Sequence, residues 1–490
     1  MKLRDVTFGK SDGYNESLEP NFSEMFYEDT GSYQKLLDTR NYIIIGRKGT
    51  GKTTLASYYK YKSNLNKNEI CDQRFANDFI QKKLLNFAQE DINKNEASLF
   101  WEYVFLLDLG AELVKFYRKK RFLSVNKLVQ SNKIKELEKI LKNEQTRIDN
   151  ITSSTSNEDE VSSGFTAGKK SSLTLNGKSK YTSSETLSKR RAIYYEEQPN
   201  LKKLVFELLK KSKQKIVLFY DDMDQFEEFM DLLSFKSLMK HMIYSADKLN
   251  HELYSFKSSK ICLVFREDIV EMMNAQANNL NKQITDSKVE ITWFDTAYSE
   301  PWEHPLMQMI LYKIKKSQPN NTKNLEEIYT EMFDRNVFEF LMDRSFGRPR
   351  DLIQYLNLYK DEFPEDEKII IKKLLKVEQK YSKWFYNEIL NELSISQDKE
   401  AIAQVIDIIS ARGYVSFTEQ QLVNYINTTS FQLVPNLSET LGIMTSTSIL
   451  GLKINGKNTV FAYRIGYPTK AQHNSKFIVN IGIRKFLSLG

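Results

Sequence analysis

Cysteine and histidine are scarce in this sequence. Cys71 and Cys262 are the two cysteines among 490 residues, and four histidines are scattered along the chain. Two thiols exclude a disulfide framework and disfavour a zinc site built on paired thiolates, and the histidine count disfavours a histidine-rich metal site. Small disulfide scaffolds are therefore excluded as a class, and structural zinc domains are disfavoured.

The sequence also lacks apolar segments typical of a signal peptide or of a membrane-spanning helix. The first residues, MKLRDVTFGKSDGYNE, have no apolar core of the signal-peptide type. The most apolar helical stretch, residues 99–117, contains three acids and a lysine and is too short and too charged to cross a bilayer. We therefore expect a reduced, cytoplasmic protein without a membrane partner.

What the sequence does contain is enough apolar surface for large cores. Hydrophobic residues make up 41% and aromatic residues 12%, which excludes a chain that is disordered throughout. At roughly 150 residues per domain, the length predicts about three domains. The net charge of +7 is modest for this length, so it permits a nucleic-acid partner without requiring one.

Buried strands alternate with helices in the first 300 residues. Apolar runs at 42–45, 215–222, 260–266 and 289–293 are typical of strands in a sheet that is covered on both faces, with helices between them. This alternation predicts an α/β fold with a parallel sheet flanked by helices. A basic helical tract and a segment rich in Ser, Thr, Gly and Asn predict an insertion at about 118–200, with a weak hairpin pattern at 164–177.

A glycine-rich segment follows the first strand and precedes a helix. It matches G-x-x-x-x-G-K-[ST] at Gly46, Gly51, Lys52 and Thr53. Backbone amides of such a turn, together with the N-terminus of the next helix, bind a triphosphate. We expect Lys52 to contact the β- and γ-phosphates and Thr53 to offer its hydroxyl to Mg²⁺. The predicted phosphate-binding residues are Gly46, Arg47, Lys48, Gly49, Thr50, Gly51, Lys52, Thr53 and Thr54.

Acidic residues end the second buried strand. Asp221 follows a run of apolar and aromatic residues, so it should lie at the carboxyl edge of the sheet, where ligands bind in such folds. We assign Asp221 to the metal and Asp222 to orienting or deprotonating the attacking water, with Asp224 a weaker candidate. The alternative is that these acids cap the helix that begins near Met223.

Two arginines are candidates for sensing the nucleotide. Arg266 ends the third buried strand and either contacts the γ-phosphate or pairs with Asp221 or Glu267. Arg350 opens a helix, from which it would fold onto the nucleotide, or else it is a surface charge beside Pro349. Arg348 is the competing choice for that role.

Four elements in order carry a resemblance to a known group: IIIGRKGTGKTT, KIVLFYDDMDQF, KICLVFRED and SFGRPRDLIQYLN. Together they resemble the STAND and origin-recognition branch of AAA+-type P-loop ATPases. The bacterial Sll-type P-loop ATPase family is the nearest likeness, with KAP-type NTPases as relatives. The resemblance covers about residues 30–365 outside the insertion. It implies a Walker B role for Asp221 and Asp222, a sensor-1 role for Arg266 and a sensor-2 role for Arg350.

The same resemblance implies a domain plan and a cofactor. Residues 1–300 would form an ATPase core that binds ATP and Mg²⁺, residues 301–365 a helical lid, and residues 366–490 a C-terminal winged-helix-like α+β domain. In that tail we expect helices at 399–411, from 418 and at 437–450, then a hairpin over 452–465 that turns at Asn455-Gly456. The third of these helices carries no Lys or Arg, which favours packing on protein over entry into a DNA groove.

Two functions follow from these observations. The first is an ATPase that acts as a conformational motor or switch. The second is a nucleotide-gated module that holds ATP and recognises nucleic acid or a protein, because Asp222 stands where AAA+ enzymes usually carry Glu and basic tracts occur at 118–147 and 189–215. Those tracts also fit solvated helix faces. The resemblance further suggests a role in bacterial antiphage defence. It also suggests a homo-oligomer, and a separate effector protein as a partner.

Overall fold

The computed structural model describes residues 1–28, 31–76, 94–120, 132–144, 197–229, 231–274, 280–295, 297–318, 320–393, 399–454, 458–466, 471 and 475–489. The chain divides into two compact units. The sheet unit comprises residues 33–45 and 59–289, and the helical unit comprises residues 1–32, 46–58 and 290–490. The predicted insertion at 118–200 lies largely outside the described residues, as does the hairpin pattern at 164–177 within it. The domain boundaries at 300 and 365 stay predictions.

A five-stranded parallel sheet forms the centre of the sheet unit, as the sequence predicted. Its strands, in the spatial order β2-β3-β4-β1-β5, are β2 (Glu69–Phe75), β3 (Lys215–Asp221), β4 (Lys260–Arg266), β1 (Ile43–Gly46) and β5 (Lys288–Glu290). Strand β3 pairs in parallel with β2 and with β4, in registers that place Gln73 beside Phe219 and Phe219 beside Cys262. The runs of buried Val, Ile, Leu and Phe in β3 and β4 fit strands with both faces covered.

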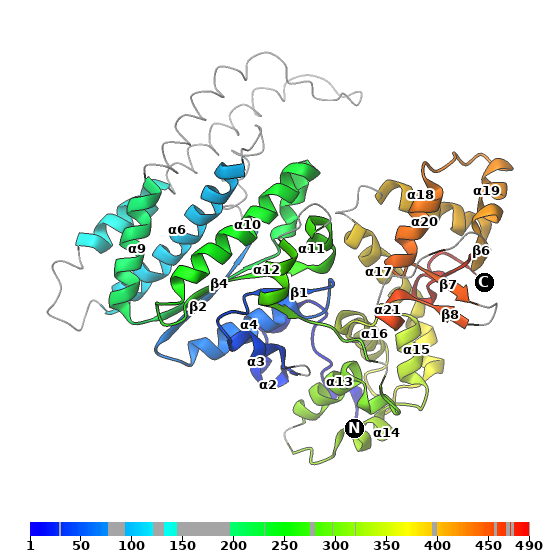
Figure 1. The fold of residues 1–490 in the computed structure, drawn as a ribbon. Helices are drawn as coiled ribbons and strands as arrows, with labels where there is room; N and C mark the ends of the chain where they lie inside the picture. The colour runs from blue at the N-terminus through cyan, green and yellow to red at the C-terminus, as the bar shows by residue number, and fades with distance from the viewer. Residues whose placement is uncertain are drawn as a thin grey trace, which may run out of the picture. The chain divides into compact units, whose positions relative to one another are not determined.

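Helices cover both faces of this sheet. Tyr59 packs on Phe219 with ring centroids 5.3 Å apart, and Phe105 packs on Tyr220 at 4.9 Å. Because consecutive strand residues point to opposite faces, these contacts place α4 (Lys52–Asn64) on one face and α6 (Lys94–Lys120) on the other. Helices α9 (Gln198–Ser212), α6 and α10 (Leu232–Leu253) run side by side (Figure 1). The remaining helices of the sheet unit are α3 (Ser32–Leu37), η3 (Met223–Phe229), α11 (Glu267–Asn274) and α12 (Leu280–Ser287), and residues 132–144 are also helical.

The helical unit holds the segment that follows the sheet. Its central helices are η4 (Pro301–Glu303), α13 (Pro305–Lys316), α14 (Leu325–Met332), α15 (Val337–Asp343), α16 (Pro349–Glu362) and α17 (Ile371–Glu392). Short N-terminal elements belong to the same unit: η1 (Leu3–Asp5), α1 (Gly13–Ser17) and α2 (Phe22–Met25). A buried ion pair between Glu16 and Lys313 fastens this N-terminal segment to α13.

A second, antiparallel sheet lies in the last hundred residues of the helical unit. Its order is β6-β9-β7-β8, formed by β6 (Ser416–Thr418), β9 (Lys476–Val479), β7 (Leu450–Ile454) and β8 (Asn458–Val460). The helices around it are α18 (Lys399–Arg412), α19 (Glu419–Asn427), α20 (Leu437–Ser446), α21 (Ala462–Ile465) and α22 (Ile481–Arg484). This α+β arrangement contains the three predicted helices, but the third, expected over 437–450, ends at Ser446, and Leu450 begins β7. A winged-helix assignment stays a prediction.

Several details of the elements differ from the sequence expectation. The strand predicted at 289–293 ends at Glu290. The predicted hairpin over 452–465 is confirmed for β7 and β8, but residues 462–465 form the helix α21, and the expected turn at Asn455-Gly456 lies outside the described residues. Phe461 and Tyr463 are both buried. Two buried residues at this spacing also fit the alternation of a strand, so the apolar pattern alone could not distinguish the short helix from a strand.

Candidate phosphate-binding site

The glycine-rich loop lies between β1 and α4, the strand–turn–helix context that phosphate binding requires. Gly49 and Gly51 have φ angles of +79° and +97°, in the region that favours glycine. A Cβ atom at Gly46 would lie 2.7 Å from Thr50 Oγ1 and 2.9 Å from the carbonyl oxygen of Ile291, so only glycine fits where the strand enters the loop. The loop therefore has the tight backbone path that the motif predicts.

Side chains inside the loop hold its shape. The ammonium group of Lys52 donates to the carbonyl oxygens of Gly46 and Arg47, both at 2.9 Å. Thr50 Oγ1 donates to the Arg47 carbonyl at 2.8 Å, and Trp293 Nε1 donates to the Thr50 carbonyl at 2.9 Å. These bonds use carbonyl oxygens only, and α4 begins at Lys52 with its N-terminus adjoining the loop.

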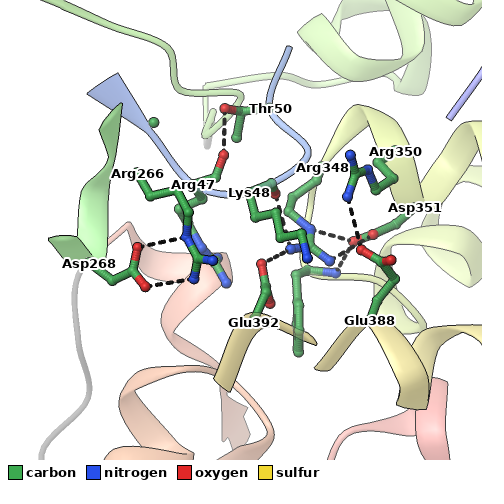
Figure 2. Close-up of polar contacts among 12 residues, drawn as sticks. Arg47, Lys48, Thr50, Arg266, Asp268, Arg348, Arg350, Asp351, Glu388 and Glu392 are labelled. Atoms are coloured by element: carbon green, nitrogen blue, oxygen red, sulfur yellow. Dashed lines mark hydrogen bonds and ion pairs between the residues drawn. The ribbon is translucent and has the colours of Figure 1, made fainter. Parts of the chain in front are cut away.

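Arg348 joins the loop to two helices. Its guanidinium donates to the Lys48 carbonyl at 3.1 Å, to both carboxylate oxygens of Asp351 at 3.0 and 2.9 Å, and to Glu392 on α17 (Figure 2). The side chain is 1% exposed. Burial alone would lower the pKa of Arg348, but the charges of Asp351 and Glu392 outweigh it and raise the pKa above its ordinary value. Arg348 is therefore a locked structural cation.

Arg350 lies on the loop itself. Its amide nitrogen is 3.4 Å from the Gly49 carbonyl oxygen, and a Cβ atom at Gly49 would lie 3.0 Å from Arg350 Cβ. The guanidinium donates from Nε to the Ser11 carbonyl at 3.0 Å. It also donates from Nη1 to Glu388 Oε2 on α17 at 3.0 Å (Figure 2). Of the two arginines proposed from the sequence, Arg350 is the more exposed, at 19% of its side chain.

In the sheet unit, Asp221 ends β3 and is 1% exposed. Its carboxylate accepts a hydrogen bond from Gln73 Nε2 at 2.9 Å and from the amide of Asp222 at 3.0 Å. Asp222 has a φ angle of +58°, a left-handed conformation that Asp tolerates better than most residues and that is found often at functional sites. This bond joins adjacent residues that precede η3, and both the metal role and the capping alternative stay predictions.

Arg266 ends β4, which lies next to β3 in the sheet. It pairs with Asp268 at 2.7 Å (Figure 2) and with Asp224 at 3.4 Å. Both partners differ from the Asp221 and Glu267 that the sequence suggested. Asp224 thus contacts the candidate sensor arginine.

The structure brings the predicted residues together in two sets. In the helical unit, residues 46–54 of the loop lie against Arg348 and Arg350. In the sheet unit, Asp221, Asp222, Asp224 and Arg266 follow the neighbouring strands β3 and β4. The loop itself follows β1, which lies beside β4 on the side away from β3.

Sequence reasoning missed three contributors to the site. Gln73, Trp293 and Glu388 contact Asp221, the loop and Arg350, as described above. Gln73 carried a weak signal, because it lies near the end of β2, where polar residues interrupt an apolar strand. Glu388 carried none, because its partner lies 38 residues earlier in the chain.

The chemistry of these donors fits a nucleotide with a divalent ion. The loop carries backbone amides and an ammonium group of the kind that bind phosphate oxygens. Thr53 in the helical unit carries a hydroxyl and Asp221 in the sheet unit a carboxylate, two ligand types that Mg²⁺ takes in proteins. Within the part of the chain that is described, no group of three or more His, Cys, Asp or Glu side chains could hold a metal. Among the described helices, none combines the length and apolar character needed to cross a membrane.

Comparisons with known proteins give two findings. Residues 304–390 match a family described as the FunZ-associated C-terminal helical domain, a segment that runs from α13 through most of α17 and includes Arg348, Arg350 and Glu388. No curated protein matches the chain. The Orc1 protein of Aeropyrum pernix, solved in complex with DNA, is similar over 96% of this chain and 95% of its own, with 9% identity and a TM-score of 0.39, a value that supports no conclusion about this chain.

Proposed function

We propose that this chain binds and hydrolyses ATP with Mg²⁺ and acts as a conformational switch. One observation carries the proposal: a glycine-rich loop with the phosphate-binding sequence connects a buried parallel strand to a helix and encloses the ammonium group of Lys52. The AAA+ and STAND assignment, with Arg266 and Arg350 as sensors, belongs to this proposal.

Each residue has a part in the proposed reaction. The amides of residues 46–54 and the charge of Lys52 bind the phosphates. Thr53 and Asp221 hold Mg²⁺, which when bound offsets charge on the phosphate oxygens. Asp222 orients the attacking water. Arg350 contacts the terminal phosphate from α16, and its position on Gly49 supports that role.

ATP turnover by purified protein tests the proposal. Lys52→Ala should abolish turnover, because it removes the point charge from the phosphates. Lys62→Ala is the matched control, since Lys62 is an exposed lysine on the same helix α4 and should leave turnover unchanged. Equal turnover by wild-type protein and Lys52→Ala would refute the proposal.

A second function is favoured by the identity of residue 222. Aspartate is one methylene shorter than glutamate, so a water held by Asp222 would lie differently, and slow hydrolysis is expected. If wild-type protein binds ATP but does not turn it over, a nucleotide-gated binding module is the better description. A filter-binding titration against salt tests nucleic acid as its partner, because contacts with phosphates weaken steeply as salt rises.

The cellular role stays a prediction of the resemblance. The resemblance predicts a role in antiphage defence, assembly into a homo-oligomer and a separate effector protein as partner. Unchanged phage sensitivity after loss of the gene would contradict the defence role, and a single monomer mass in light scattering with and without ATP would contradict the oligomer.

A further inference from the structure

Helix α17 presents two glutamates to the arginines that touch the loop. Glu388 and Glu392 are four residues apart and so lie on one face of the helix. Glu392 pairs with Arg348, and Glu388 pairs with Arg350 at 3.0 Å. All four residues and the loop belong to the helical unit.

The two ion pairs differ in how firmly they are held. Arg348 has a second carboxylate, Asp351, and is almost fully buried. Among the described residues, Arg350 has one carboxylate partner, Glu388, and these side chains are 19% and 15% exposed. An ion pair that reaches solvent is worth less than a buried one and opens more readily. The Arg350–Glu388 pair is therefore the one that a ligand can open.

A carboxylate and a phosphate bind the same donors of a guanidinium. Arginine presents its N–H groups in a fixed planar fork that matches either anion, so the donor given to Glu388 cannot serve a phosphate oxygen at the same time. The stem of Arg350 lies on Gly49, at the loop where the proposed nucleotide binds. Glu388 thus occupies an Nη1 donor of Arg350 that a phosphate oxygen would otherwise accept from.

We propose that Glu388 is an internal competitor of the terminal phosphate of the nucleotide for Arg350, an inference that rests on the proposed function. ATP binding opens the Arg350–Glu388 pair, and ADP, which lacks the γ-phosphate, leaves it closed. The pair therefore lowers the affinity for ATP, and its opening releases Glu388 of α17 when ATP is bound.

The same helix contacts the C-terminal residues of the chain. Ser382 Oγ accepts a hydrogen bond from the Phe486 amide at 2.9 Å, and Tyr386 packs on Phe486 with ring centroids 4.9 Å apart. A Cβ atom at Gly482 of α22 would lie 2.7 Å from the Phe385 ring. Because α17 is packed this closely on the α22 segment, release of Glu388 bears directly on the C-terminal part of the helical unit.

Nucleotide titrations of the full chain test the competitor. Isothermal titration calorimetry with Mg²⁺ and either ATPγS or ADP gives the affinities of wild-type protein, Glu388→Gln and Glu378→Gln. Glu388→Gln should bind ATPγS about fivefold tighter or more, the usual lower size of a coupling between a ligand and a switch. Its affinity for ADP should stay within about twofold, because ADP does not compete.

Glu378→Gln is the matched control. Glu378 lies on the same helix and pairs with Arg344 at 2.6 Å, away from the loop residues, so its affinities should equal those of wild type. In an Arg350→Gln background, Glu388→Gln should no longer change ATPγS affinity, whereas a general loosening of α17 would still change it. Circular dichroism checks that each variant folds.

The outcomes separate this inference from the proposed function. If wild-type protein binds ATPγS, Lys52→Ala does not, and Glu388→Gln binds no tighter than wild type, the competitor role is overturned and the nucleotide site stands. Equal tightening for ADP and ATPγS would overturn it as well. If wild-type protein binds neither nucleotide, the proposed function itself fails.

Discussion

The sheet unit and the helical unit position their charged side chains by different means. In the sheet unit, Asp221 and Arg266 take their places as the last residues of strands, and the backbone ladder fixes them before any side-chain partner is considered. In the helical unit, Arg348 and Arg350 are placed by ion pairs with α17 and by contacts with the loop. Removing a partner should therefore affect the helical unit more than the sheet unit.

Substitution of Arg348 should have the largest effect on the free energy of unfolding. Arg348→Met leaves the fully buried carboxylate of Asp351 without its guanidinium, which should lower the free energy of unfolding by about 3–5 kcal/mol. Urea denaturation followed by circular dichroism measures the change. Arg350→Met, at a more exposed pair, should cost less than about 1 kcal/mol. Equal losses for the two variants would remove the distinction between a locked and a releasable cation.

The next effect concerns Asp221, where charge should matter for activity and little for stability. Asp221→Asn keeps the size of the side chain and an oxygen for the Asp222 amide, but it removes the negative charge that would hold Mg²⁺. Turnover should fall by about 100-fold or more, since a metal contributes several kcal/mol to such reactions. Steady-state ATPase assays over a range of Mg²⁺ concentrations measure it, and turnover at the wild-type rate would remove Asp221 from the metal site.

Acid should loosen the helical unit through His304. Burial lowers the pKa of His304 from 6.5 to about 4, and its Nδ1 accepts the Leu306 amide at the start of α13. A histidine whose folded pKa is lowered gives stability that is complete above pH 6.5 and is lost as the pH falls toward 4. The loss should reach about 2 kcal/mol at pH 5.

His304→Asn isolates this group, because asparagine also caps helices but does not titrate in this range. Urea midpoints measured from pH 7.5 to 5 should fall less for His304→Asn than for wild type. Parallel curves for the two proteins would show that His304 is not the titrating group.

The smallest effect is expected at Gln73, in the sheet unit. Gln73→Ala removes one hydrogen bond to Asp221 at a cost of about 1 kcal/mol, and turnover should fall by less than about tenfold, because β3 still fixes Asp221. Stopped-flow or steady-state ATPase assays measure it beside Asp221→Asn. A loss of turnover as large as that of Asp221→Asn would mean that side-chain partners position the charged groups of both units in the same way.

The same contrast explains what the sequence could predict. The parallel sheet, the strand–turn–helix path of the glycine-rich loop, Asp221 at a strand end and the helix that begins after its N-cap Thr418 are all seen in the structure, because each depends on neighbours within a few residues. The cap bonds Thr418 with Gln421, only three residues away. Local patterns of this kind are visible in one sequence.

The partners of the arginines were not predictable. Arg348 contacts Lys48, 300 residues earlier, and Glu392, 44 residues later, and nothing local favours these partners over any other carbonyl or carboxylate. The sequence left Arg348 and Arg350 as rivals for one role, whereas the structure gives each its own partners. The separation of these roles required the tertiary packing of α16 on α17.

The hydrogen bond from Trp293 to Thr50 gives experimenters a natural optical reporter. The indole is 8% exposed, and its N–H bonds to the carbonyl of a loop residue at 2.9 Å. Indole emission shifts when its hydrogen bonding and solvation change, so a rearrangement of residues 46–54 would change the fluorescence of unlabelled protein. With the other three tryptophans replaced by phenylalanine, the emission of Trp293 would follow events at the loop in real time without a dye.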